Sequence, residues 1–321
     1  MATMENPVRS RSSINLGELL RCTACRGTLN EEGGGYVCAA CSRAFPLERG
    51  VIRFVNPENY ADSFGFQWQR YARTQMDDAE SRESEIDFSR KTGLTPAELE
   101  GKLVLDVGCG MGRFADVATR WGARVVGIDL SAAAEVAARN LAEREFVALQ
   151  ADVFALPFAA ETFDFIYSVG VLHHTPSCEQ AVKALPQYLK PGGTLSVWLY
   201  SAYNPWYRFS DFYRKFTHRM PAKTLHGILR VVVPVVNGVD SALRVLPLVG
   251  RPLSGLLRYV VPVNRNLNRQ WRVLDTFDWY SPKYQSKHTY EEVFPWFESS
   301  GLEDLHVEEV PIAVRGRKPL R

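Results

Sequence analysis

Three glycines at alternate positions carry the strongest chemical signal in the sequence: Gly108, Gly110 and Gly112. They follow an apolar run over 103–107 that contains the acid Asp106, and this order predicts a buried strand that turns sharply into a helix. Glycine adopts positive φ and lets the backbone approach a ligand, and the first turn of a helix offers free N–H groups. Arg113 stands where a dinucleotide-binding loop needs its third glycine, and a carboxylate beside the turn repels phosphate. The loop therefore favours a ligand that carries an amine or a sulfonium.

Four cysteines form two Cys-x-x-Cys pairs separated by twelve residues: Cys22, Cys25, Cys38 and Cys41. Two such pairs predict a tetrahedral zinc site, with the glycines at 33–35 in the turn between them. Because four thiolates leave no open coordination position, we expect the metal to be structural rather than catalytic. The alternative is four unrelated buried cysteines.

Two further acids stand at the ends of expected strands, in a region where apolar strands alternate with helical stretches as in repeated βα units. Asp129 ends the strand at 124–129, about twenty residues after the glycines, where a carboxylate can accept hydrogen bonds from both hydroxyls of a ribose. Its alternative role is to cap the next helix, although Ser131 is better placed for that. Asp152 follows the strand at 145–150.

The glycine loop resembles the first motif, Asp-x-Gly-x-Gly-x-Gly, of the class I S-adenosylmethionine-dependent methyltransferases. The resemblance covers residues 101–200 well and 285–321 loosely, and it implies an α/β fold, a doubly wound seven-stranded Rossmann-like sheet. It also implies that Asp152 accepts a hydrogen bond from the exocyclic amine of adenine, that the Val153 N–H meets a ring nitrogen and that Leu130 packs on the ring. The cofactor-binding residues implied are Asp106, Gly108, Gly110, Gly112, Asp129, Leu130, Asp152, Val153 and Ser168.

The transferred methyl should point toward residues 170–176, which follow an expected strand at 163–169. His173 and His174 are the nearest ionisable side chains, and an imidazole can accept a proton near neutral pH. The alternative is that they cap the next helix or line the cofactor. The Asn/Asp-Pro-Pro-aromatic motif of methylases that act on exocyclic base amines does not occur here.

The composition, with 321 residues and 46% hydrophobic content, predicts two to three globular domains. No apolar core of a signal peptide follows Arg9 and Arg11, and no uncharged apolar run reaches 18 residues, so we expect a cytoplasmic protein with reduced or metal-bound cysteines. The expected domains are a flexible tail (1–15), a zinc ribbon (16–58), an aromatic helical cap segment (59–100), a methyltransferase domain (101–200 and 273–321) and a basic, apolar helical insertion (201–272).

Two of these segments offer residues that could reach the active site. In the cap segment, Gln67 and Trp68 are candidate lid residues, with simple helix packing as the alternative. Near the end of the chain, Tyr280, Tyr284 and His288 are candidate substrate-site residues in an aromatic linker. The ribbon resembles those at the front of some rRNA guanine methyltransferases over about forty residues.

The insertion carries most of the positive charge. Between residues 203 and 272, twelve Lys or Arg face two acids, a formal +10 in a chain whose total is +2. Apolar runs at 231–236 and 256–261 lie among these charges, a composition typical of an element at a membrane interface. We therefore expect 205–265 to form a helical lid that contacts an anionic membrane, with a homodimer interface or an acceptor-pocket wall as the alternative.

Together these features predict methyl transfer from S-adenosylmethionine to a small-molecule acceptor that is hydrophobic or lipid-linked, by O- or C-methylation, with one structural Zn²⁺. The alternative is an rRNA methyltransferase in which the ribbon and the basic insertion hold RNA. The aliphatic runs favour the small molecule over nucleic acid, because nucleic-acid surfaces pair charge with polar and aromatic groups. A third reading is a scaffold that binds the cofactor without turnover.

Overall fold

In this computed structural model, the described residues are 13–56, 59–204 and 208–320. Residues 1–12 of the expected tail and 205–207 of the expected insertion lie outside them. The ribbon consists of α1 (Leu16–Leu19) and an antiparallel sheet of β1 (Leu29–Glu32), β2 (Gly35–Cys38) and β3 (Ala44–Phe45). Gly33 and Gly34 make the turn between β1 and β2 at φ values of +60° and +81°, which glycine adopts without steric cost.

Within the described residues, nine strands form the central sheet, in the order β11-β12-β10-β9-β6-β7-β8-β5-β4. Their bounds are Leu47–Glu48 (β4), Val51–Arg53 (β5), Leu103–Val107 (β6), Arg124–Asp129 (β7), Phe146–Gln150 (β8), Phe163–Val169 (β9), Leu189–Trp198 (β10), Glu303–Val307 (β11) and Ala313–Arg317 (β12). Strands β10 to β5 are parallel, and β12 runs antiparallel to β10 and β11, so the expected C-terminal hairpin is present.

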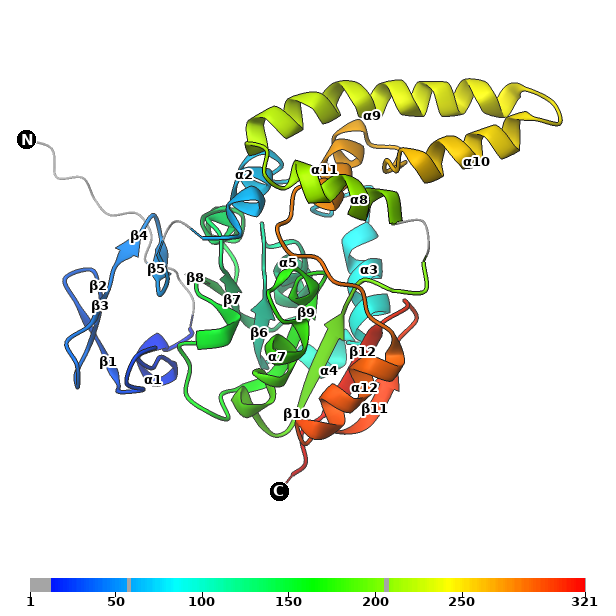
Figure 1. Ribbon diagram of the computed structural model, residues 1–321. Helices are drawn as coiled ribbons and strands as arrows, with labels where there is room; N and C mark the ends of the chain where they lie inside the picture. Colours follow the sequence, from blue (N-terminus) through cyan, green and yellow to red (C-terminus); the bar gives the residue numbers. More distant parts are fainter. Residues whose placement is uncertain (1–12, 57–58, 205–207, 321) are drawn as a thin grey trace, which may run out of the picture.

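The sheet is wider than expected. Strands β11 to β8 are the seven strands of the doubly wound fold, and the end of the ribbon adds two more. β5 pairs in parallel with β8, with Ile52 opposite Leu149, because Val51 and Ile52 bury their side chains against the edge of the sheet. The expectation of seven strands is corrected to nine, and the ribbon is continuous with the sheet rather than a separate unit (Figure 1).

Helices cover both faces of the sheet. On β6, Leu103 and Leu105 point into one apolar cluster and Val104 into another, as the alternation of a strand buried on both sides requires. One cluster packs under α7 (Cys178–Lys183) and α12 (Tyr290–Ser299), the other under α3 (Glu83–Thr92), α4 (Pro96–Leu99), α5 (Arg113–Arg120) and α6 (Ala133–Asn140). Three 3₁₀ turns are η1 (Val153–Ala155), η2 (Leu172–His174) and η3 (Pro186–Tyr188).

A helical layer lies above the carboxyl ends of the strands. It consists of α2 (Asp62–Arg70), α8 (Arg208–Thr217), α9 (Ala222–Val245), α10 (Gly250–Val260) and α11 (Arg269–Tyr280). α9 and α10 run side by side and project from the body as an arm (Figure 1). Leu229, Val233 and Phe277 join α9 to α11 in a third apolar cluster. The boundary expected at 272 and 273 falls inside α11, which packs with the arm and with α2.

Candidate active site

The glycine loop lies between β6 and α5, as the sequence predicts. Gly108, Gly110 and Gly112 have φ values of +83°, +53° and +91°, so a side chain at any of them would strain the backbone. A Cβ at Gly108 would also overlap the Val171 side chain at 2.3 Å, and one at Gly112 would lie 2.9 Å from Leu141 of the α6 end. The first glycine therefore allows the β9 loop to approach, and the third allows α5 to pack on α6.

Asp129 ties this loop to the end of β7. Its Oδ2 accepts a hydrogen bond from the Gly110 N–H at 3.0 Å, and its Oδ1 accepts from the Ser131 N–H and hydroxyl at 2.8 and 2.7 Å. The Ser131 hydroxyl oxygen in turn accepts from the N–H of Ala133, the first residue of α6, although the N-cap position itself is held by Ala132 and not by Ser131. Burial raises the pKa of Asp129, against the effect of the Ser131 and Gly110 hydrogen bonds. Three of its four lone-pair directions are thus used within the chain.

Asp106 lies fully buried beneath the loop. Burial raises its pKa to about 8, although the neighbouring Tyr167 hydroxyl opposes the shift. Neither Asp106 Oδ2 nor the Tyr167 hydroxyl has a hydrogen-bond partner of good geometry among the described residues. A buried carboxyl group with an unused oxygen fits a nearby cationic ligand, because a positive charge would stabilise its ionised form.

A cavity of about 510 Å³ opens at the carboxyl ends of β6, β7, β8 and β9, where open α/β sheets bind ligands. Of the expected cofactor residues, the structure brings six to its wall: Gly108, Gly110, Asp129, Leu130, Asp152 and Val153. The other three are not on the wall: Asp106, Gly112 and Ser168. Ser168 is fully buried and donates its hydroxyl to the Val107 carbonyl, so it joins β9 to β6 instead of reaching the cavity.

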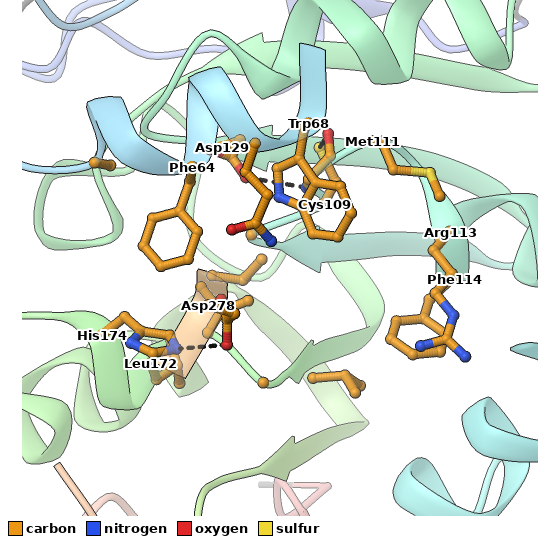
Figure 2. A pocket seen from close by; sticks show the side chains of 18 of the residues that line it. Phe64, Trp68, Cys109, Met111, Arg113, Phe114, Asp129, Leu172, His174 and Asp278 are labelled. Carbon is orange, nitrogen blue, oxygen red and sulfur yellow. Dashed lines mark hydrogen bonds and ion pairs between the residues drawn. The ribbon is translucent and has the colours of Figure 1, made fainter. Parts of the chain in front are cut away.

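Helix α2 forms part of the roof. Gln67 and Trp68 both line the cavity, and Gln67 Oε1 is buried without a partner among the described residues. The same helix approaches α6 at Gly65, where a Cβ would stand 3.4 Å from the Ala132 nitrogen. α2 therefore reaches the cavity and also packs on α6, and the lid role of Gln67 and Trp68 stays a prediction. Figure 2 shows Phe64 and Trp68 reaching from α2 toward the cavity, with the Phe64 ring 5.1 Å from that of His174.

His174 has a defined place in the cavity wall. Its Nδ1 lies 3.1 Å from the Tyr284 carbonyl, an acceptor, so Nδ1 carries the hydrogen and Nε2 holds a lone pair. That Nε2 is buried, makes no hydrogen bond with any described residue and faces Asp278 Oδ2 at 3.9 Å (Figure 2). Asp278 also accepts a hydrogen bond from the Tyr200 hydroxyl at 2.8 Å. Burial lowers the pKa of His174, while Asp278 and the Tyr284 carbonyl oppose the shift.

His173 differs from its neighbour. It is fully buried, stacks on Tyr200 with ring centroids 3.9 Å apart, and does not line the cavity. Neither ring nitrogen has a hydrogen-bond partner among the described residues, and burial lowers its pKa well below the ordinary value. The structure thus brings His174 to the site and leaves His173 in the layer behind it.

The aromatic linker expected near the end of the chain contributes differently from the prediction. Tyr280 is the last residue of α11 and donates its hydroxyl to the Pro262 carbonyl, away from the cavity. His288 contacts Ser286 and Glu292, so it too lies elsewhere. Tyr284 serves through its backbone carbonyl, which holds His174.

The far end of the cavity was missed by sequence reasoning. Lys91 and Arg113 both pair with Asp87 Oδ2, at 3.0 and 3.1 Å, beneath aromatic rings: Phe114, Trp198 and Trp271. Burial and Asp278 raise the pKa of Asp275 to about 7, and its oxygens accept from Gln75 and Asn264. In Figure 2, Arg113 and Phe114 lie at the opposite side of the view from His174. The sequence signal for this end is the cluster of Trp and Asp in 271–279.

The four cysteines of the ribbon converge. Their sulfur atoms all lie within 4.8 Å of one another, with Cys22 Sγ 3.6 Å from Cys41 Sγ and Cys25 Sγ 3.4 Å from Cys38 Sγ. Four thiolates bound to zinc at about 2.3 Å stand about 3.8 Å apart in a tetrahedron. The arrangement therefore fits one structural zinc, and the alternative of unrelated cysteines is excluded by their convergence.

Known protein families match both the zinc ribbon and the central sheet region. Residues 105–197 match a family described as a methyltransferase domain, and residues 15–50 match one described as Trm112p-like protein. A ubiquinone biosynthesis O-methyltransferase of Nitrosococcus oceani is 34% identical over 142 residues, which are 43% of this chain and 60% of that protein. A sterol 24-C-methyltransferase of Gibberella zeae is 30% identical over 145 residues, 43% of this chain and 37% of that protein.

These sequence matches cover only part of this chain and only part of each relative. The chain spans less than two thirds of the length of the curated relatives that it matches first. Among solved structures, an S-adenosylmethionine-dependent methyltransferase from Mesorhizobium loti superposes with a TM-score of 0.42 at 18% identity, over 69% of this chain and 93% of that one. None of the helices in the described ranges is both long and apolar enough to cross a membrane.

Proposed function

Residues 105–197 belong to the class I S-adenosylmethionine-dependent methyltransferases and are preceded by a Trm112-like zinc ribbon, and on this premise we propose that the chain transfers a methyl group to a small-molecule acceptor. The observation that carries the proposal is the cavity itself. Its wall combines the glycine loop and two strand-end acids, Asp129 and Asp152, with a buried histidine whose Nε2 is free to accept a proton.

S-adenosylmethionine fits the strand end of the cavity. The acids Asp129 and Asp152 would meet its ribose and adenine, Leu130 would pack on the ring, and the buried carboxyl group of Asp106 beneath the loop suits its positive charge. When bound, the cofactor supplies an activated methyl group. The chain's own task is to hold the acceptor in line with that methyl, which can lower the barrier by roughly 7 to 11 kcal/mol.

His174 is the proposed general base. With Nδ1–H held by the Tyr284 carbonyl, its Nε2 can take the proton of an acceptor hydroxyl, and Asp278 would then stabilise the imidazolium. Tyr200 orients the Asp278 carboxyl group through its hydrogen bond. Because burial lowers the pKa of His174, the imidazole is in its neutral, proton-accepting form at neutral pH.

The acceptor proposed is a hydrophobic or lipid-linked molecule with an acidic hydroxyl, such as an alkylated phenol. The far end of the cavity offers aromatic walls at Trp198, Trp271 and Trp279, and the relatives named above methylate molecules of ubiquinone and sterol synthesis according to their names. Tritiated S-adenosylmethionine with a farnesylated phenol and, separately, with rRNA tests this. Label in the phenol supports it. Label only in RNA would establish the rRNA alternative, and cofactor binding without label in either would favour the scaffold.

The arm is the proposed membrane contact. At its tip, Val245 and Leu248 are 82% and 97% exposed, and Arg244 and Arg251 flank them. Apolar side chains can enter the headgroup boundary while the guanidinium groups stay with lipid phosphates. The occupant proposed for this surface is therefore an anionic bilayer, which would deliver a lipid-linked acceptor.

Co-sedimentation with phosphatidylglycerol vesicles at low and high salt tests the arm. We expect binding at low salt that weakens at high salt, and its loss in the double variant Val245→Asp/Leu248→Asp, with Val307→Asp, an exposed residue of β11, as the matched control. Absence of low-salt binding by the folded wild type would end the membrane proposal. A shift of the same double variant from dimer to monomer in sedimentation velocity, without vesicle binding, would assign the tip to a homodimer.

A further inference from the structure

A second hollow, of about 610 Å³, lies where α2, α9 and α11 meet, outside the cavity described above. Its wall contains four arginines: Arg70 from α2, Arg230 from α9, and Arg269 and Arg272 from α11. The other described residues of the wall are neutral or apolar apart from His226, and none of them is Asp or Glu. Four positive charges thus face one space with no carboxylate in its wall.

These charges have no counterion within the described part of the chain. None of the four arginines forms an ion pair there, whereas Arg113, which lines the cofactor cavity, pairs with Asp87. Arg272 donates only to backbone carbonyls, those of Asn266 and Leu267, which fix its guanidinium without neutralising it.

The positive charge of the arginines acts on the buried side chain of His226. His226 and Tyr71 both line the hollow, and the His226 Nε2 and the Tyr71 hydroxyl are hydrogen-bonded at 2.8 Å. The pKa of His226 is lowered by burial and further by Arg70 and Arg230, so those two charges lie close to the same ring. Such concentration of like charge costs free energy unless an anion shares the space.

We propose that this hollow binds a phosphate-bearing ligand through Arg70, Arg230, Arg269 and Arg272. Guanidinium groups bind phosphate oxygens in a bidentate way, and four of them match the multiple negative charge of a diphosphate or of a phosphorylated headgroup better than that of a single carboxylate. The space also exceeds what a single carboxylate would fill. The source of the phosphate is either a lipid headgroup or a free phosphate compound, and the experiment separates them.

The hollow shares two helices, α2 and α11, with the cofactor cavity. α2 presents Trp68 to the cofactor cavity and Arg70 to the hollow, and α11 presents Asp275 to the cavity and Arg272 to the hollow. An anion bound between α2 and α11 stabilises their packing and so makes the roof of the cofactor cavity more rigid. Binding at the two places is then coupled, and by linkage each ligand strengthens the other equally.

The test is titration calorimetry of the full chain with pyrophosphate, and flotation with vesicles that contain phosphatidylglycerol or only phosphatidylcholine. The variant is Arg230→Ala/Arg269→Ala, and the control is Arg43→Ala/Arg73→Ala, two exposed arginines that do not line the hollow. We expect pyrophosphate affinity to fall roughly tenfold for each arginine removed, with the control unchanged. Thermal melting of both variants verifies that each is folded.

The pyrophosphate and vesicle measurements have distinct outcomes. Loss of pyrophosphate binding with unchanged vesicle binding identifies a free phosphate compound as the ligand, and loss of phosphatidylglycerol binding as well identifies a headgroup. Absence of pyrophosphate and vesicle binding by the wild type, or equal losses in variant and control, would overturn the proposal. Because the readout is anion binding, a failed methyl-transfer assay leaves it untouched, and its own failure leaves the methyl-transfer proposal standing.

Discussion

At the cofactor end of the cavity, the expected residues that reach the wall all lie at the end of a strand or within three residues after it, whereas the far end is assembled mainly from α3, α5 and α11. Asp129 and Asp152 are held in place by backbone N–H groups two residues away or in the adjoining loop. At the far end, Asp275 is held by Gln75 and Asn264, the first of them 200 residues away in the chain. Sequence motifs can therefore predict the cofactor end, because its residues are held by contacts that are local in the sequence. They cannot predict the far end, whose contacts join distant segments.

The largest effect should come from His174, in the cavity wall on the side opposite Arg113 and Phe114. We expect His174→Ala to lower kcat by about 10²- to 10⁴-fold, because the proton acceptor is lost, while the dissociation constant of S-adenosylmethionine stays within a few-fold. Steady-state kinetics and calorimetry on the same preparations measure both. His306→Ala on β11 is the matched control, an exposed histidine that does not line the cavity. Equal loss of kcat in both variants, or unchanged kcat in His174→Ala, would remove the base from this position.

The second effect should be confined to the cofactor end. Asp129→Ala removes a carboxylate that holds the Gly110 N–H and faces the cavity, and the loss of charge-assisted hydrogen bonds should cost about 1.5 to 3 kcal/mol of cofactor affinity. Calorimetry measures the change. Asp164→Ala, an acid at the opposite end of β9, is the control. Unchanged affinity in Asp129→Ala would contradict the ribose assignment.

The third effect is a pH dependence of cofactor affinity from Asp106. With a pKa raised to about 8 by burial, the free carboxyl group is largely protonated at pH 7, and a cationic ligand favours its ionised form. Affinity should therefore rise with pH by at most about tenfold between pH 7 and pH 9 and level off above, with proton release on binding below pH 8. Calorimetry in buffers of different ionisation enthalpy measures the released proton. The same slope in Asp106→Asn would assign it to another group.

Much of the fold was predictable because its signals are local. The alternation of apolar strands and helices gave β6 to β9 nearly to the residue, and the cysteine spacing gave the metal site. The extension of the sheet by β4 and β5 was not predictable, since a short Val-Ile pair says nothing about which edge will bury it. Likewise Ser168 lies at a strand end in sequence, yet only the packed sheet reveals that its hydroxyl turns to the Val107 carbonyl.

The two adjacent histidines show the same limit, and they give the smallest and last prediction. His173 and His174 are equivalent in sequence, but the first is buried behind the wall with both nitrogens unpartnered among the described residues. His173→Phe keeps a ring stacked on Tyr200 and removes the unpartnered polar atoms, so kcat should stay within a few-fold.

Its effect on stability should appear only in acid. Burial lowers the pKa of His173 in the folded protein well below 6.5, so between the folded and unfolded pKa values the unfolded state binds the extra proton. Wild-type stability therefore falls as pH drops below 6.5, by up to about 1.4 kcal/mol per pH unit for this group, and the His173→Phe protein should lose less over that window. Urea unfolding from pH 7 to pH 5 measures both curves, with His306→Phe as the exposed control. Parallel curves for wild type and His173→Phe, or a loss of kcat comparable to that of His174→Ala, would return His173 to the catalytic group and erase the distinction between the wall and the layer behind it.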